Sequence, residues 1–259
     1  MIKKSCLPMP LSMTLTCSVL FSIFACSSDE AIQTEVAEQN SEVTLGTNLT
    51  AKTYVAPGSS SIFASALTKC KLQSDYLSSD VTNLSNYASS FFYLRESTNK
   101  MVLYNNNGAS TRTELRRNDN FDKTSVRKMA ISAKLESQPA GEVTLAQLHN
   151  QNAALPVLRV SVTGNTIYYK VNKEPVKGTS LTNNGAFTTT LPADKSLEIV
   201  LELTGNKYIS ATVNGEKRTF FIENAWGSAF DNAYYFKTGV YCQSTGTAKL
   251  AYNSLVWDN

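Results

Sequence analysis

The stretch "LPVLRVSVTGN" (residues 155–165) indicates how this chain folds. Its apolar residues Leu158, Val160 and Val162 alternate with polar ones, which is the period of a β-strand that has one buried face. "TGN" then supplies turn-forming residues, and "NTIYYKVN" (165–172) returns to residues that favour strands. The stretch therefore predicts two neighbouring antiparallel strands.

The same pattern recurs on both sides of this stretch. "KMAISAKLES" (128–137) and "KSLEIVLELTGN" (195–206) alternate in the same way, and "YISATVNGEKRTFFI" (208–222) carries Asn-Gly between two strand-like runs, the signature of a tight hairpin. The sequence contains no long amphipathic helix pattern and no internal repeat. Strands at this spacing predict an all-β fold, an antiparallel β-sandwich of jelly-roll type.

The composition agrees with an extracellular β-protein. Charged residues make up only 17% of the chain, below the usual quarter, whereas tyrosine and phenylalanine are plentiful. Residues 1–50 hold two lysines against five carboxylates, a net charge of −3, so the rest of the chain carries +6 of the total +3. A basic domain behind an acidic segment suits an anionic partner.

The first residues have the features of an export signal. Lys3 and Lys4 precede the apolar run "PLSMTLTCSVLFSIFA". "IFAC" (23–26) resembles a bacterial lipobox, which implies cleavage before Cys26, lipidation of its thiol and a membrane anchor at the outer membrane or the cell surface. The alternative is ordinary secretion with an unmodified Cys26. These features divide the chain into a lipoprotein signal peptide (1–25), an acidic tether (26–56) and a folded domain (57–259).

Two of the five cysteines belong to the folded domain. Cys6 and Cys17 leave with the signal peptide, and Cys26 carries the lipid, so only Cys70 and Cys242 remain. In an oxidising compartment these two can form a disulfide. The alternative is two separate buried thiols, and the sequence leaves both open because it does not give their distance.

"RTELR" (112–116) places three charges on one face of a predicted strand. Alternate residues of a strand point the same way, so Arg112, Glu114 and Arg116 project together. Two guanidinium groups beside a carboxylate can grip an anion through paired N–H donors. The alternative is an ordinary solvated face with mixed charges.

"QLH" (147–149) holds the only histidine of the chain. Strand parity puts Gln147 and His149 on one face and Leu148 on the other. An amide beside an imidazole suits a reaction in which one group holds charge and another moves a proton; the alternative is a surface histidine. Zinc is disfavoured because there is no second histidine and no cysteine cluster with ligand spacing. We predict no metal and no cofactor.

"YYFKTGVYCQ" (234–243) is a third amphipathic stretch with functional side chains on one face. The residues that share this face are Tyr235, Lys237, Gly239, Tyr241 and Gln243. Gly239 leaves a bare spot at which a ligand can approach the backbone. The alternative is an ordinary strand at the edge of a core.

Together these stretches resemble the alginate lyases of polysaccharide lyase family 7. That family carries R-(S/T)-E-(L/V)-R, Q-(I/V)-H and Y-F-K-x-G-x-Y-x-Q in this order, and the resemblance spans most of residues 61–259. It implies a jelly roll with a concave substrate-binding sheet. Leu148 stands where the family usually has Ile or Val. Because Leu148 should face the core, we expect activity to be retained. The choice between Ile and Val is what usually indicates whether a member prefers mannuronate or guluronate blocks, so Leu148 leaves this preference open.

The resemblance implies cleavage of the 1,4-links of alginate by β-elimination. Arg112 and Gln147 neutralise the carboxylate next to the C5 proton, with His149 close by. Tyr241 is base and acid for mannuronate, in which the proton and the leaving oxygen lie on the same side. For guluronate, in which they lie on opposite sides, neutral His149 is the base and Tyr241 the acid.

Further residues are expected to bind the substrate. Glu114 is expected to orient an arginine rather than to react. Glu114, Arg116, Lys237 and Gln243 are predicted substrate-binding residues, with Arg159 added from strand parity alone. The expected partner is anionic alginate, with no nucleic acid, and the expected state is a monomer.

Three other functions are alternatives to the cleavage of alginate. A glycoside hydrolase needs two carboxylates beside the scissile bond, and the motifs supply only Glu114. A non-catalytic polyuronate-binding lipoprotein can use the same fold but has little need of His149 together with Tyr241. A lyase for another polyuronate, such as glucuronan, is compatible with all the motifs.

Overall fold

The structure, a computed structural model, describes residues 53–176 and 182–258. The predicted signal peptide, Cys26 and nearly all of the tether lie outside the described residues. Residues 52–259 form one compact unit. Val55 pairs with Leu94 in an isolated β-bridge, so the folded domain begins slightly before the predicted boundary at residue 57.

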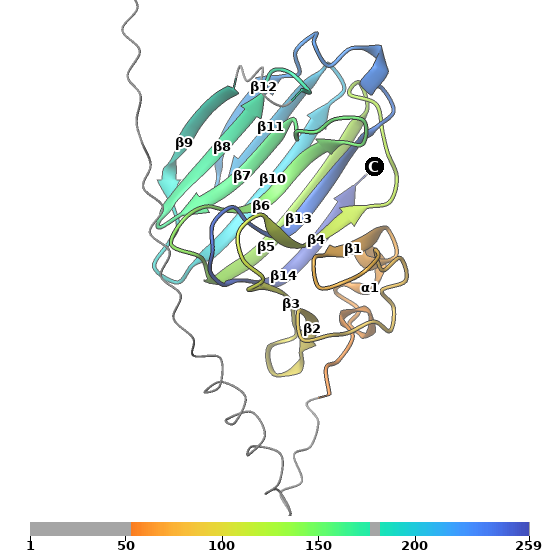
Figure 1. The fold of residues 1–259 in the computed structure, drawn as a ribbon, viewed down its shortest axis with the longest axis vertical. Helices are drawn as coiled ribbons and strands as arrows, with labels where there is room; N and C mark the ends of the chain where they lie inside the picture. Colours follow the sequence, from red (N-terminus) through yellow and green to blue (C-terminus); the bar gives the residue numbers. More distant parts are fainter. Residues whose placement is uncertain (1–52, 177–181, 259) are drawn as a thin grey trace, which may run out of the picture. The chain divides into compact units, whose positions relative to one another are not determined.

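The domain is a sandwich of two antiparallel sheets of seven strands each (Figure 1). The front sheet has the order β1 (Cys70–Ser74), β4 (Thr111–Arg117), β13 (Tyr234–Cys242), β6 (Val143–Asn150), β7 (Leu158–Thr163), β8 (Thr166–Asn172), β9 (Thr182–Thr190). The back sheet has the order β12 (Glu216–Phe221), β11 (Tyr208–Val213), β10 (Ser196–Thr204), β5 (Val126–Ser137), β14 (Ala248–Asp258), β3 (Lys100–Asn105), β2 (Phe92–Arg95). The predicted all-β jelly-roll sandwich is confirmed.

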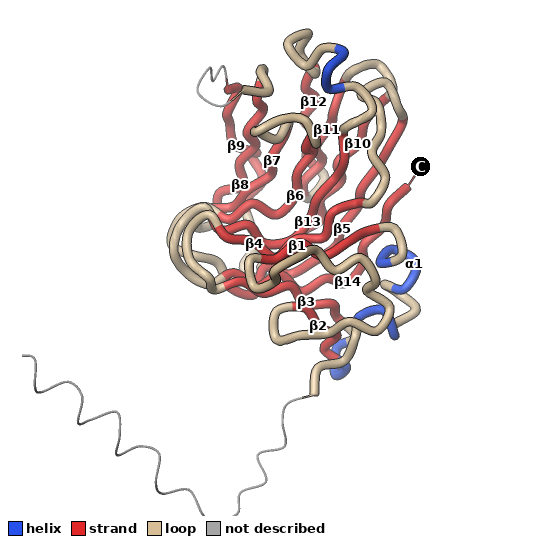
Figure 2. The backbone as a smooth tube through the Cα atoms, turned by 45° about the vertical axis from the view of Figure 1, so that its right-hand side comes forward, coloured by secondary structure: helices blue, strands red, loops and turns tan. Residues whose placement is uncertain are grey.

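Helical structure within the described residues is short. It consists of α1 (Ala64–Leu67) and the 3-10 turns η1 (Pro57–Ser59), η2 (Glu96–Thr98) and η3 (Ser228–Phe230). Figure 2 shows α1 beside the end of β14, where Trp257 Nε1 donates to the Ala66 carbonyl at 3.1 Å. In the part of the chain that the structure describes, no helix has the length and apolar character needed to cross a membrane.

The core lies between the sheets and follows the alternation seen in the sequence. Leu158, Val160 and Val162 of β7 are completely buried. Their counterparts in β5, such as Ile131 and Leu135, are 2% exposed. Burying each such side chain contributes about 1.5–3 kcal/mol. The opposite faces of the strands are thereby left free to carry polar side chains.

The predicted hairpin is also confirmed. Asn214 (φ 47°) and Gly215 (φ 87°) connect β11 to β12 with both residues in the left-handed region, as a type I′ turn requires. The Asn214 side chain accepts a hydrogen bond from the Glu198 backbone N–H at 2.9 Å. This bond braces the turn against β10.

The disulfide between Cys70 and Cys242 is ruled out. Cys70 pairs with Arg117 and Cys242 with Thr111, at opposite ends of β4. Six strand residues span about 20 Å, whereas a disulfide needs Cα atoms within about 7 Å. Both cysteines are free and buried, and burial raises the pKa of the Cys70 thiol to about 12. The alternative of two separate thiols is the correct one.

Candidate active site

The front sheet brings the three motifs together on adjacent strands β4, β13 and β6. Between β13 and β4, Tyr241 lies opposite Arg112 and Lys237 lies opposite Arg116. Between β13 and β6, Lys237 lies opposite Gln147 and Tyr235 lies opposite His149. Antiparallel partners point to the same face. The pairing therefore gathers residues from three distant parts of the sequence into one site.

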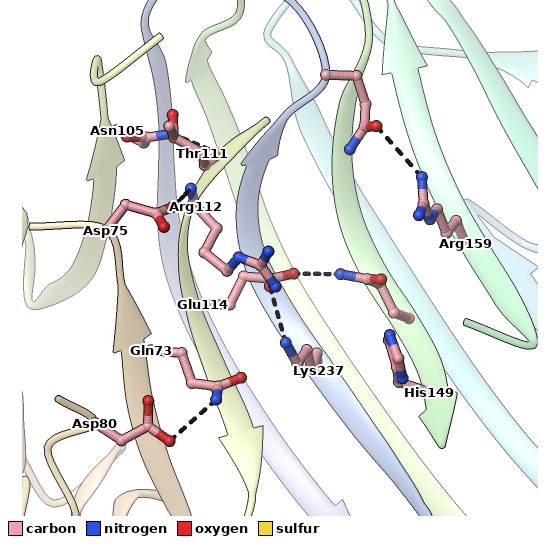
Figure 3. A network of polar contacts seen from close by, with 12 residues as sticks. Gln73, Asp75, Asp80, Asn105, Thr111, Arg112, Glu114, His149, Arg159 and Lys237 are labelled. Atoms are coloured by element: carbon pink, nitrogen blue, oxygen red, sulfur yellow. Dashed lines mark hydrogen bonds and ion pairs between the residues drawn. The ribbon is translucent and has the colours of Figure 1, made fainter. Parts of the chain in front are cut away.

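A cleft of about 380 Å³ opens over these strands. Figure 3 shows several of its residues, among them Gln73, Arg112, His149 and Lys237. It is lined by Gln73, Ser74, Asp75, Asp80, Arg112, His149, Tyr235 and Lys237. A second hollow of about 320 Å³ lies around Lys123 and Asp231, but none of the motif residues lines it. The cleft over β4, β13 and β6 is the candidate active site.

Arg112 combines a fixed backbone with an accessible head group. Its backbone exchanges hydrogen bonds with Asp75, whose carboxylate accepts from the Arg112 N–H. Its side chain is 35% exposed, and Nη1 lies 3.9 Å from Glu114 Oε2. Arg112 can therefore present N–H donors to an anion in the cleft.

Glu114 lies at the centre of the site but beneath its surface. It is 1% exposed. It accepts a hydrogen bond from the Gln147 amide and another from Lys237 Nζ at 3.4 Å. The carboxylate is covered, and contact between Glu114 and substrate stays a prediction. It orients the groups around it, as expected for a buried partner of functional side chains.

Lys237 is also more buried than predicted. It is 3% exposed, and burial lowers its pKa, although the neighbouring Glu114 carboxylate acts in the opposite direction. Its ammonium group borders the cleft from below. Lys237 is therefore a source of positive potential under the site, and its contact with a ligand is confined to the tip of the side chain.

His149 belongs to a stack of three side chains. The Arg116 guanidinium carbon lies 3.9 Å from the centre of the Tyr235 ring, and that ring lies 5.4 Å from the His149 ring at an angle of 11°. Burial lowers the pKa of His149 to about 4, against the effect of a hydrogen bond with Asn150. The imidazole is therefore neutral at neutral pH.

The backbone of Asn150 holds one nitrogen of this ring. His149 Nδ1 lies 2.9 Å from the Asn150 carbonyl oxygen, to which it can donate, and 2.8 Å from the Asn150 N–H, from which it can accept. The second bond places the ring proton on Nε2, and the first places it on Nδ1. When Nδ1 carries the proton and donates it to the carbonyl, Nε2 is the nitrogen that can accept a proton. That tautomer is the one a general base requires.

Arg116, a predicted substrate-binding residue, supports the stack of Tyr235 and His149. It is 9% exposed, and Nη2 donates to Asn120 at 3.0 Å and to Gln151 at 3.3 Å. Its charge faces Tyr235 and these amides. Tyr235 was assigned no role from the sequence, although its strand parity with Lys237 was the signal that placed it in the site.

Arg159 and Gln243 belong to a second group around Tyr241, and none of these three residues is among those that line the cleft. Arg159 Nη1 donates to Gln243 Oε1 at 3.3 Å. The guanidinium carbons of Arg112 and Arg159 lie 4.7 Å and 5.7 Å from the centre of the Tyr241 ring. Both guanidinium groups therefore lie within cation–π distance of the Tyr241 ring. Within the described residues, Arg159 Nε and Gln243 Nε2 are buried donors without a partner.

Gly239 is required by packing and not by ligand approach. Its φ is 154°, and a Cβ atom placed there would lie 2.3 Å from the Thr113 carbonyl oxygen and 2.6 Å from Glu114 Cα. It would also lie 3.1 Å from Leu103 of the back sheet. The pairing of β13 with β6 is irregular between Thr238 and Tyr241. The interpretation of Gly239 as a bare spot for a ligand is therefore wrong.

Gln147 is fixed by the same network. It is 2% exposed, and its amide nitrogen donates to Glu114. Because a carboxylate only accepts hydrogen bonds, this contact orients the amide and leaves one N–H of the same nitrogen for another acceptor. Gln147 is not among the residues that line the cleft, and its burial limits it to a single further contact.

Comparisons with known proteins agree with the fold and the motifs. Similar solved structures include alginate lyase A1-II′, described as a member of polysaccharide lyase family 7 (22% identity, TM-score 0.63, 74% of this chain and 95% of that one). Alginate lyase AlyC3 is also similar (19% identity, TM-score 0.69, 83% of this chain and 99% of that one). So is alginate lyase PA1167 from Pseudomonas aeruginosa (15% identity, TM-score 0.63, 74% of this chain and 99% of that one). A search of curated proteins gave no match.

A family model also matches the sequence of this chain. The model of the family described as "Alginate lyase" matches residues 67–259, which include every strand of the front sheet and the whole candidate site. This chain therefore belongs to the alginate lyase family.

Proposed function

We propose that the cleft over β4, β13 and β6 cleaves the 1,4-links of alginate by β-elimination and releases unsaturated uronate oligosaccharides. One observation carries the proposal: Arg112, His149 and Tyr241, from three strands, share one face above the buried Glu114–Lys237 pair. That arrangement supplies a carboxylate-binding group, a neutral base and a phenol at one place.

The first task of the site is to make the C5 proton acidic. While the adjacent carboxylate keeps its charge, loss of this proton creates a second negative charge on the same group. The exposed guanidinium of Arg112 and the oriented amide of Gln147 offset that charge through hydrogen bonds to the carboxylate. Lys237 adds positive potential from beneath without requiring direct contact.

For mannuronate, Tyr241 serves as both base and acid. Its phenolate, whose ring lies beside the guanidinium groups of Arg112 and Arg159, takes the C5 proton. The C5–H electrons form the C4–C5 double bond, and the bond from C4 to the leaving oxygen breaks. Tyr241 then returns the proton to that oxygen, so the side chain ends the cycle as it began.

For guluronate, the proton and the leaving oxygen lie on opposite faces of the sugar. Neutral His149 takes the C5 proton and Tyr241 protonates the leaving oxygen. The stack of Arg116 and Tyr235 holds the imidazole in place, and its burial keeps it unprotonated at neutral pH.

Complexes of the similar structures support oligosaccharide binding in this fold. AlyC3 has been determined with dimannuronate, and variants of A1-II′ with its product and with a substrate. The groove of this chain is proposed to bind the same class of ligand.

The division of labour is tested with block-specific substrates. Poly-mannuronate, poly-guluronate and glucuronan are incubated with the protein, and the ultraviolet absorbance of the C4–C5 double bond is followed. His149→Asn is expected to reduce guluronate cleavage by about 100-fold or more, the usual contribution of a general base, and mannuronate cleavage less. Equal losses on both polymers contradict separate roles, and faster cleavage of glucuronan contradicts the proposed substrate.

We also propose that the protein is a monomeric lipoprotein of the outer membrane, anchored through Cys26. The basic start, the apolar run and "IFAC" support this proposal. A Cys26→Ser variant expressed in bacteria is expected to move from the membrane fraction to the soluble fraction and to lose incorporated fatty acid. Retention of Cys26→Ser in the membrane with unchanged labelling contradicts the anchor.

A further inference from the structure

A β-bulge interrupts the front sheet next to Tyr241. Thr238 of β13 lies opposite Ala146 of β6, and the next pair along these strands is Tyr241 with Thr144. Two residues of β13 thus face a single residue of β6, Leu145, which has no partner in the register of β6 with either neighbouring strand. Bulges bend a strand and are common next to active sites, where they change the direction of a side chain.

The bulge decides which residue of β6 lies beside Tyr241. If the pairing continued without a step, Tyr241 would lie opposite Val143, which is completely buried in the core. A slip of one residue exchanges the two faces of a strand, so the bulge brings Thr144 to the face of Tyr241 instead. Thr144 Oγ1 lies 3.0 Å from Ser161 Oγ of β7. On the other side of β13, the register with β4 has no such step.

Two buried hydroxyl groups contact the bulge from the core side. Thr238 Oγ1 donates to the Leu145 carbonyl oxygen at 3.0 Å and lies 2.9 Å from the Tyr252 hydroxyl. Both side chains are completely buried. Because the Thr238 hydroxyl has a single proton and gives it to Leu145, Tyr252 is the donor in the second bond. The hydroxyl groups therefore form a directed chain from β14 of the back sheet to the bulge.

The chain supplies a hydrogen bond at the point where the strand pairing is broken. A bulge disrupts the ladder of backbone hydrogen bonds locally, and at this one the Leu145 carbonyl accepts from a side chain. Burial raises the pKa of the Tyr252 phenol, so this hydroxyl keeps its proton and remains a donor. A buried carbonyl or hydroxyl that loses its partner is destabilising, and removal of the chain therefore favours a different arrangement of the bulge.

We infer that Thr238 and Tyr252 are positioning residues for Tyr241, because their hydroxyl groups hold the bulge that sets Tyr241 opposite Thr144. Neither side chain reaches the cleft, since both lie in the core between the sheets. The effect on rate rests on the proposed function, in which Tyr241 moves a proton for mannuronate and for guluronate. Loss of the hydroxyl groups should therefore slow both reactions.

Variants of Thr238 test the chain at its centre. Thr238→Val keeps the shape of the side chain and removes the hydroxyl. It is expected to lower kcat about tenfold on poly-mannuronate and on poly-guluronate, since a displacement of about 1 Å can cost about 100-fold. KM should not change, because β4 keeps its register and its Arg112. Thr238→Ser retains a hydroxyl and should restore most of the rate.

Tyr252→Phe tests the first donor of the chain. It should reduce kcat less than Thr238→Val does, because Thr238 can still donate to Leu145. The two hydroxyl groups act in series, so the double variant should lose no more than Thr238→Val alone.

Tyr234→Phe is the matched control for Tyr252→Phe. Tyr234 lies on β13 itself and is also completely buried, but within the described residues its hydroxyl has no hydrogen-bond partner. Its removal should leave kcat unchanged on both polymers. A loss in Tyr234→Phe as large as that in Tyr252→Phe overturns the inference.

Hydrogen–deuterium exchange separates this inference from the proposed function, because it needs no turnover. Thr238→Val should speed exchange of the backbone amides in residues 143–147 and 239–242, and Tyr234→Phe should not. If the wild-type protein forms no unsaturated product but this difference appears, the proposed function fails and the hold on the bulge stands. If product forms but the exchange of Thr238→Val equals that of the wild type, the inference fails alone.

The rates give further outcomes that overturn the inference. These are a loss of kcat confined to one polymer, a Thr238→Ser variant as slow as Thr238→Val, and losses that add in the double variant. If Thr238→Val does not fold, Tyr252→Phe decides through the same rates and the same exchange, and a wild-type result in both overturns the inference.

Discussion

Replacing Glu114 by Gln removes the only carboxylate at the centre of the described site. Glu114 is 1% exposed and faces Lys237 Nζ at 3.4 Å and Arg112 Nη1 at 3.9 Å. The Lys237 side chain is 4% exposed. In the variant, Lys237 must either remain charged without a partner or lose its proton.

The expected cost follows from this burial. Removing one partner of a buried ion pair typically destabilises a protein by about 3–5 kcal/mol. For a domain of this size each kcal/mol lowers Tm by about 2–4 °C, so Glu114→Gln should lower Tm by about 10 °C. Glu202→Gln is the matched control, because the Glu202–Lys217 pair is exposed (38% and 53%) and should contribute less than about 1 kcal/mol.

Calorimetry gives the Tm of both variants, and urea unfolding at neutral pH gives their free energies of unfolding. The double variant Glu114→Gln with Lys237→Met is expected to recover much of the lost stability, because it removes the unpaired charge as well. Activity should not recover, since Gln147 has lost the carboxylate that orients it. A Tm of Glu114→Gln within about 2 °C of the wild type, or a loss no larger than that of Glu202→Gln, refutes the reasoning.

Three further predictions concern His149, Tyr235 and the cysteines. His149 gains a proton below about pH 6.5 in the unfolded chain but only near pH 4 in the folded domain. The free energy of unfolding of the wild type, relative to that of His149→Asn, should therefore fall by about 3 kcal/mol as the pH drops from 6.5 to 4. If urea unfolding gives the same difference between the two proteins at both pH values, this prediction is contradicted. Tyr235→Leu should slow guluronate cleavage more than Tyr235→Phe, which keeps the ring between Arg116 and His149; equal rates contradict the stack. A reductant should leave Tm unchanged, because Cys70 and Cys242 are free, whereas a native disulfide contributes about 2–4 kcal/mol; a lower Tm in reductant contradicts the free thiols.

The fold was predictable because strand alternation is a local property of the sequence. Leu158 and Val162 report a buried face without reference to any other strand, and Asn214–Gly215 reports a tight turn. The distance between Cys70 and Cys242 was not predictable in this way. It depends on the pairing of both β1 and β13 with β4, which is a long-range property.

The sequence indicated which residues belong to the site, but not which of them are buried beneath its surface. Strand parity placed Arg112, Glu114 and His149 on one face, as the structure shows. Parity does not say which side chains lie beneath others. Glu114 and Arg116 are covered because side chains from other segments pack against them and bond to them. Their predicted contact with substrate stays a prediction.

The most direct test of the account is the ultraviolet absorbance of the C4–C5 double bond when alginate is mixed with the wild-type protein, Tyr241→Phe and Tyr208→Phe. Tyr208 is 43% exposed on the back sheet and serves as the control. We expect a steady rise with the wild type and Tyr208→Phe, and a rate at least about 100-fold lower with Tyr241→Phe. No rise with the wild type, or an undiminished rise with Tyr241→Phe, contradicts elimination by Tyr241 in this groove.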